Sequence, residues 1–140
     1  MVTINHLAVF VAALSSLVLG CIWYGPLFGK PWMRLAGLSH EKIAEAKKKG
    51  MAGRYSVMLI GTVVMSYVLW HEITFAIAFF GVSGIGAGLE GGFWIWLGFI
   101  APVLMGAVLW EGKSWTLWLI NAGYYLLSLM LMGGILASWM

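Results

Sequence analysis

Ionisable side chains within long apolar runs are the residues whose type and position best suit chemistry in this sequence. His71 and Glu72 lie near the end of the second run, Glu90 near the start of the third, and Asn5 and His6 at the start of the first. Because such groups are costly to bury in hydrocarbon, several at one depth would suit proton transfer or metal binding. Alternatively, headgroups and water solvate all of them near the helix ends, and we favour this second interpretation.

Asn121, in "INAGYYL", is a polar residue placed well inside an apolar run. It lies about two turns into the fourth run, where an amide needs a hydrogen-bond partner. The candidate partners at similar depth are Tyr24, Glu111 or a carbonyl freed by a glycine bend. We predict that Asn121 makes a structural hydrogen bond, and contact with a substrate is the alternative.

Residue patterns typical of catalysis are missing from the sequence. His71-Glu72 does not begin an HExxH zinc motif because Phe75 stands at the position of the second histidine, and the chain has no GxSxG, no P-loop and no Asp. The single cysteine, Cys21, excludes CxxC motifs and is expected to be a buried apolar thiol. We therefore predict no enzymatic activity, no metal and no cofactor.

The elements that must position these residues are membrane-spanning helices. The chain of 140 residues is 62% hydrophobic and 9% charged, with a mean hydropathy of +0.95, which leaves too little polar surface for a water-soluble globule. A hydrocarbon core of about 30 Å needs about 20 helical residues. Runs of this length predict one transmembrane domain with spans at about residues 4–24, 53–75, 88–110 and 115–139.

The positive charges predict the orientation of these spans. All Lys and Arg residues lie between the first and second spans or between the third and fourth, and the positive-inside rule places both connections in the cytoplasm. Both termini then face outward. The formal net charge of +3 suits anionic lipid headgroups and gives no reason to invoke nucleic acid.

The basic insertion, residues 26–52, includes "SHEKIAEAKKKG", which predicts a short interfacial helix with Ser39 as N-cap. Its Lys47, Lys48 and Lys49 would attract anionic headgroups, or they form a solvated face that enforces topology.

Aromatic residues mark the expected membrane interfaces, because amphipathic rings favour that layer. In "WYGPLFGKPW" we expect Pro26 and Pro31 to stop the first helix, and a kink is expected at Pro102. The glycine-rich residues 80–92 predict a flexible outer loop or a re-entrant segment, of which we favour the loop. The expected interface anchors are Trp23, Tyr24, Trp32, Trp110 and Trp115.

Small residues recur at four-residue intervals, which lets helix backbones approach closely in a membrane. We predict that these rows pack inside the bundle, with an oligomer interface as the alternative. The rows comprise Ala12, Ser16 and Gly20; Gly84, Gly88 and Gly92; and Gly133 with Ala137.

The segments "WYGPLFGKPW", "LGFIAP" and "INAGYYL" together resemble a family of small bacterial membrane proteins catalogued as domain of unknown function seventeen sixty-one. The resemblance covers nearly the whole chain and implies a four-span helical membrane fold. It implies no activity and no site residues.

The sequence thus predicts an all-α membrane protein with four transmembrane helices in two hairpins and a short cytoplasmic interfacial helix. Its expected place is the bacterial cytoplasmic membrane, with both termini outside. We expect a packing or interaction protein that forms a homo-oligomer or joins a larger membrane complex. The alternative is a small oligomeric transporter or channel for a small solute or ion.

Overall fold

The computed structural model describes residues 4–140, and every regular element in that range is helical. The helices are α1 (His6–Ile22), the π-helix η1 (Trp23–Leu27), α2 (Gly29–Ala36), α3 (His40–Lys48), α4 (Ala52–Phe80), α5 (Gly84–Ile95), the π-helix η2 (Trp96–Ile100), α6 (Ala101–Leu109) and α7 (Trp115–Ser138).

Four helical segments are long and apolar enough to cross a membrane, as the sequence predicts. They cover His6–Leu27, Ala52–Phe80, Gly84–Leu109 and Trp115–Ser138. Their lengths of 22, 29, 26 and 24 residues each exceed the roughly 20 residues that a bilayer requires. These candidate spans indicate a multi-pass membrane protein.

The expected loop over residues 80–92 was wrong. Only residues 81–83 are non-helical there, and α5 begins at Gly84. Glycine disfavours a helix by about 1 kcal/mol per residue relative to alanine. Here packing outweighs that cost, because Gly88 and Gly92 are buried against α7, where no larger residue would fit.

The prolines do not stop the helices as expected. Pro26 lies inside η1, so the first span stays helical to Leu27, and Pro31 lies in the first turn of α2, where its missing N–H costs nothing. Pro102 lies in the first turn of α6, two residues after η2 ends at Ile100. The α-helical hydrogen-bond ladder is thus interrupted by one π-helix that contains a proline and one that ends two residues before a proline.

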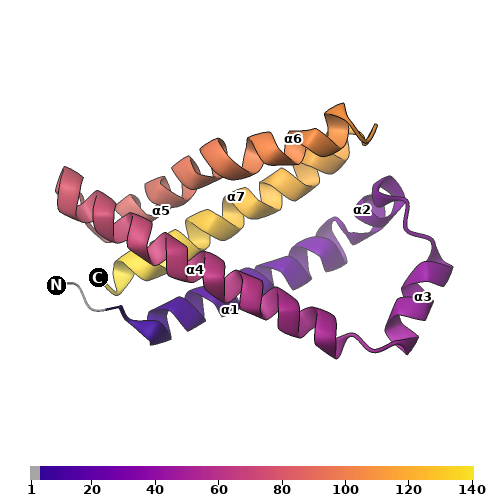
Figure 1. Cartoon of the computed structure of the whole chain (residues 1–140), viewed down its shortest axis with the longest axis horizontal. Coiled ribbons are helices and arrows are strands. Elements are labelled where there is room, and N and C mark those ends of the chain that lie inside the picture. The colour runs from indigo at the N-terminus through magenta and orange to yellow at the C-terminus, as the bar shows by residue number, and fades with distance from the viewer. Residues whose placement is uncertain (1–3) are drawn as a thin grey trace.

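The core lies where α1, α4 and α7 meet. α7 is the most buried span and also packs along α5 and α6, whereas α4 crosses the other helices obliquely (Figure 1). The start of α1 and the end of α7 lie at one end of the molecule, and α2 and α3 lie at the other (Figure 1). The core residues are Ala8, Val9 and Ala12 of α1, Leu69, Trp70 and Ile73 of α4, and Leu129, Met132, Leu136 and Ala137 of α7.

Candidate functional site

The ionisable residues predicted near the helix ends do not form one site. Nδ1 of His71 lies 2.8 Å from the carbonyl oxygen of Tyr67, and Glu90 Oε1 accepts a hydrogen bond of 3.3 Å from Trp94 Nε1. Both partners belong to the same helix as the residue they bond. Within residues 4–140, no group of three or more His, Cys, Asp or Glu side chains could hold a metal ion.

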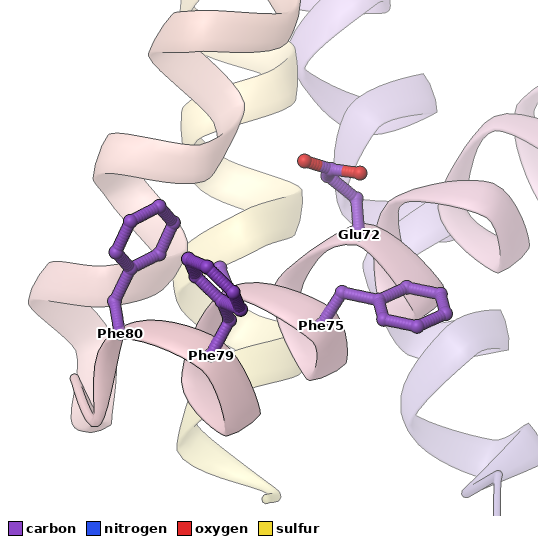
Figure 2. Close-up of a pocket in the computed structure, with 5 residues that line it drawn as sticks. Glu72, Phe75, Phe79 and Phe80 are labelled. Atoms are coloured by element: carbon purple, nitrogen blue, oxygen red, sulfur yellow. The ribbon is translucent and has the colours of Figure 1, made fainter.

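Glu72 lines an open pocket of about 300 Å³ at the end of α4. Figure 2 shows its carboxylate rising from the helix, with Phe75, Phe79 and Phe80 arranged along the same stretch of α4. All residues that line this pocket, Ala76 included, come from α4, so no second helix faces the carboxylate across it. The pocket is an aromatic surface with one acidic group, and it lacks the converging polar groups of a typical binding site.

Asn121 joins three elements through its side-chain oxygen. Asn121 Oδ1 accepts a hydrogen bond of 3.0 Å from Tyr24 Oη of η1 and one of 3.1 Å from Trp32 Nε1 of α2. Because an indole N–H can only donate, the atom that faces Trp32 must be the amide oxygen. We call Tyr24, Trp32 and Asn121 the Asn121 cluster.

The π-helix η1 positions the aromatic residues of this region. Trp23 begins η1, and its Nε1 donates a hydrogen bond of 2.9 Å to the carbonyl oxygen of Ile120 on α7. Gly123 leaves room for the indole, since a Cβ added there would lie 3.2 Å from the Trp23 ring. A larger residue at position 123 would therefore press on this ring.

Of the five expected interface anchors, three bond inside the molecule. The polar atoms of Trp23, Tyr24 and Trp32 all bond to α7, so these rings hold helices together. Sequence reasoning named Tyr24 among the candidate partners of Asn121 but missed the inward turn of Trp23 and Trp32, because the direction of a ring depends on local helix geometry. Trp110 and Trp115 remain 87% and 53% exposed, and their anchoring stays a prediction.

The second π-helix repeats this arrangement. Trp96 begins η2 and donates a hydrogen bond of 2.8 Å from Nε1 to the carbonyl oxygen of Ala122. On the same side of α7, Trp118 Nε1 donates to the carbonyl oxygen of Ala101 at 3.1 Å. The recurrence of Trp-x-Gly, at residues 23–25 and 96–98, is a sequence signal that could have indicated this pairing.

A buried hydroxyl network connects α1 with α7. Ser16 Oγ lies 3.3 Å from Tyr124 Oη and also bonds to Ser128 Oγ, while Tyr124 Oη donates to the carbonyl oxygen of Ser16 at 3.2 Å. Ser16 belongs to the small-residue row predicted on the first span, and Gly20 of that row faces the Tyr124 ring. Ser128 was missed, because a lone serine in an apolar run gives no sign of which side it faces.

The glycine rows on α5 and α7 meet directly. A Cβ added at Gly88 would collide with the backbone of Gly133 and with the Ala137 side chain, and one added at Gly92 would collide with the backbone of Leu129. Gly84 lies apart from this contact: it begins α5 with φ of +76°, and a Cβ there would meet no atom within 4 Å.

The remaining predicted residues lie on the surface. Lys47, Lys48 and Lys49 are exposed at the end of α3, whose first turn is capped by Ser39 Oγ accepting from the backbone N–H of Lys42 at 3.2 Å. Cys21 is exposed, so the expectation of a buried thiol was wrong. It faces outward from a helix that other elements cover on only one side.

The chemistry of the interior is that of neutral groups bonding one another. Within residues 4–140, every buried side-chain nitrogen or oxygen atom has a hydrogen-bond partner. Hydroxyl, amide and indole groups paired in this way fix helix positions.

Comparison with known proteins gives one match. The family model described as "Protein of unknown function (DUF1761)" matches residues 7–137, a range that includes nearly all of the four candidate spans. No curated protein and no solved structure matches the chain.

Proposed function

The chain belongs to the family described as protein of unknown function DUF1761, and we propose that it works through helix contacts within the bilayer. In this role it forms a homo-oligomer or serves as an accessory subunit of a larger membrane complex. The role is non-enzymatic and needs no cofactor, metal or nucleic acid.

One observation carries this proposal: the contacts of α7 with α5 and α1 are tightly closed. At Gly88 and Gly133 two helix backbones touch, with no space for even an added methyl group. Between α1 and α7, the buried polar side chains of Ser16, Tyr124 and Ser128 form hydrogen bonds with one another. Closed contacts of this kind support a contact function over passage of a solute between these helices.

The outward face of α4 is the surface we assign to a second copy. Val57, Val64, Val68 and Phe75 are exposed and recur at intervals of seven and four residues, so they lie on one face of the helix. Tyr55 is also exposed but lies on the opposite face of α4. It therefore provides a matched control position.

Disulfide cross-linking tests this assignment. In a Cys21→Ser background, we expect Val64→Cys to form linked dimers on oxidation in native membranes, whereas Tyr55→Cys should not. Cys21 must be replaced because its thiol is exposed. Equal cross-linking at both positions, or none at any residue of the Val57–Phe75 face, would remove the homo-oligomer from the proposal.

The alternative, a small oligomeric transporter or channel, has one observation in its favour. The first and third candidate spans each contain a π-helix with a proline inside it or two residues after it, and such wide turns occur frequently at functional sites. Proteoliposomes containing the full chain test it. A proton or K⁺ flux no greater than that of protein-free liposomes is expected, and a flux that grows with protein density would favour the alternative.

We further propose that the protein lies in the bacterial cytoplasmic membrane with both termini outside and residues 26–52 inside. The support is the clustering of Lys and Arg in two connections, with Lys47, Lys48 and Lys49 of α3 at the anionic headgroups. In the Cys21→Ser background, Lys47→Cys should react with an impermeant maleimide only after the membrane is opened. Labelling from outside in intact cells would show that the orientation is the reverse of the one proposed.

A further inference from the structure

One face of α7 is covered along only part of its length. Asn121, Tyr125, Met132 and Leu136 follow one another at intervals of four, seven and four residues, so they form one stripe, which we call the α7 stripe. Met132 and Leu136 are 0% exposed, because Leu69, Trp70 and Ile73 of α4 pack in the same cluster.

The other half of the α7 stripe is left uncovered by α4. α4 crosses α7 near the C-terminal end of α7. The N-terminal part of α4 lies away from α7, toward α3 (Figure 1). In the diverging part, residues 52–58 are all exposed, which shows that they contact little of the molecule. Asn121 and Tyr125, the polar members of the stripe, are only half-buried.

Within the described residues 4–140, the amide nitrogen of Asn121 has no hydrogen-bond partner. Tyr24 and Trp32 both occupy the amide oxygen, which turns Nδ2 away from them. Within residues 4–140, no hydrogen bond involves this nitrogen, and no buried side-chain nitrogen or oxygen lacks a partner. Asn121 Nδ2 therefore reaches the molecular surface inside a membrane span with two N–H groups to donate.

The hydroxyl group of Tyr125 is in the same situation one turn further along. Its ring packs edge-on against Tyr124, with 5.1 Å between ring centroids, but within the described chain Tyr125 Oη makes no hydrogen bond. By the same reasoning this oxygen lies at the surface. Side chains four residues apart are neighbours on a helix, so the uncovered stripe carries two adjacent donors.

We propose that Asn121 Nδ2 and Tyr125 Oη bind the ester oxygens of an anionic phospholipid whose acyl chains lie along the part of α7 that α4 leaves uncovered. A polar group in hydrocarbon needs a partner, and a lipid supplies carbonyl acceptors. The helix rises about 9 Å from Trp115 to Asn121 and about 15 Å from Trp115 to Tyr125, at about 1.5 Å per residue. Both side chains lean toward the N-terminal end of α7, so the lipid must reach below the usual glycerol level to meet the two donors.

The preference for an anionic lipid comes from α2. Trp32 holds α2 beside Asn121, and Lys30 and Arg34 lie two residues before and two after Trp32 on the exposed side of this short helix, from which their long side chains reach the headgroup layer. Both cations are exposed at the end of the molecule where the lipid headgroup would lie. A phosphate with a net negative charge would be attracted to them.

Native mass spectrometry of the delipidated full chain tests the two parts of the site separately. The probes are phosphatidylglycerol and phosphatidylcholine with identical acyl chains. Wild type should bind phosphatidylglycerol more tightly. Tyr125→Phe should weaken both lipids about threefold to tenfold, the size expected for one lost hydrogen bond, and Lys30→Gln with Arg34→Gln should weaken phosphatidylglycerol alone.

Tyr55→Phe is the matched control, because Tyr55 is an exposed tyrosine on α4 at the same end of the molecule. It should leave both affinities unchanged. Asn121→Asp keeps an oxygen for Tyr24 and Trp32 but replaces the donor, and it should lose at least as much phosphatidylglycerol affinity as Tyr125→Phe. If that variant does not fold, the Tyr125→Phe result decides.

Three results would overturn the site. Tyr125→Phe binding both lipids like wild type would show that the hydroxyl contacts no lipid. An equal loss in Tyr55→Phe would show that lipid binding is unspecific. Retained preference for phosphatidylglycerol after the Lys30→Gln and Arg34→Gln changes would remove α2 from the site.

Discussion

α7 meets α5 and α1 in opposite ways. Toward α5, Gly88 and Gly92 bring two helix backbones into direct contact. Toward α1, the hydroxyl groups of Ser16, Tyr124 and Ser128 bond across the contact. Lipid tails provide no hydrophobic drive for helices to associate, so close packing and interhelical hydrogen bonds must supply it. α7 uses one of these on each side.

The difference determines which substitutions each contact tolerates. The α5 contact has no free space, so a substitution that adds a side-chain atom should weaken it more than one that removes side-chain atoms. The α1 contact depends on particular polar atoms, so removing one weakens it by the value of a hydrogen bond. The most damaging substitution on the α5 side therefore adds side-chain volume, whereas the one on the α1 side removes a polar atom. The expected losses of stability also differ in size.

Gly88→Ala should have the largest effect. Its Cβ would collide with the backbone of Gly133, which cannot move without separating the helices. We expect a loss of at least about 1–3 kcal/mol in the free energy of unfolding, as for overpacked cores, measured by SDS-induced unfolding in mixed micelles. Gly86→Ala is the control on the same helix, since its Cβ would meet no atom within 4 Å. Equal effects in the two variants would show that α5 does not rest on α7 as described.

Asn121→Leu should weaken the contact of α7 with η1, which continues α1, and with α2, by a smaller amount. It removes the acceptor that Tyr24 and Trp32 share. Interhelical hydrogen bonds in membranes are worth about 0.6–2 kcal/mol, because separated helices also find partners. We expect an unfolding free energy lower by that amount in the same assay, with oligomer contacts intact. Unchanged stability would mean that Asn121 does not hold these elements together.

The sequence was sufficient for the features that depend on length and spacing. Four spans follow from apolar runs of about 20 residues, and the four-residue spacing of Gly88, Gly92, Gly133 and Ala137 predicted a close contact. Tyr24 was one of three candidate partners that similar depth suggested for Asn121, with Glu111 and a freed carbonyl as the others. These inferences need no knowledge of where any side chain points.

The remaining features depend on directions that only packing determines. The inward turn of Trp23 requires η1 and the space at Gly123, neither of which a hydropathy pattern reveals. The helix over residues 84–95 forms despite its glycines because α7 covers it. A local propensity scale assigns that segment to a loop, and tertiary contact overrides the scale.

Trp23→Phe should have a moderate effect. It keeps an aromatic ring against Gly123 but removes the N–H that donates to Ile120. We expect a loss of about 0.5–1.5 kcal/mol, the net value of one hydrogen bond. Membrane insertion, measured by carbonate extraction, should be unchanged because the length of the span drives it. Trp110→Phe, at an exposed position, should leave stability within about 0.5 kcal/mol of wild type. A loss of insertion in Trp23→Phe would identify the indole as part of an insertion signal.

The smallest effect concerns the coupling between Ser16 and Ser128. Their hydroxyl groups bond to each other between α1 and α7, and both side chains are fully buried. Each alanine variant alone mixes several losses, since Ser16 also bonds to Tyr124. A double-mutant cycle with Ser16→Ala and Ser128→Ala isolates the pair, and we expect a coupling energy of about 0.6 kcal/mol. The same cycle with Ser16→Ala and Gly86→Ala should give no coupling, because Gly86 lies on α5 and a Cβ added there would meet no atom within 4 Å. A coupling of zero in the first cycle would mean that Tyr124 alone provides the hydrogen bonding on this side, and that packing contributes more to the α1 contact than the comparison of the two sides implies.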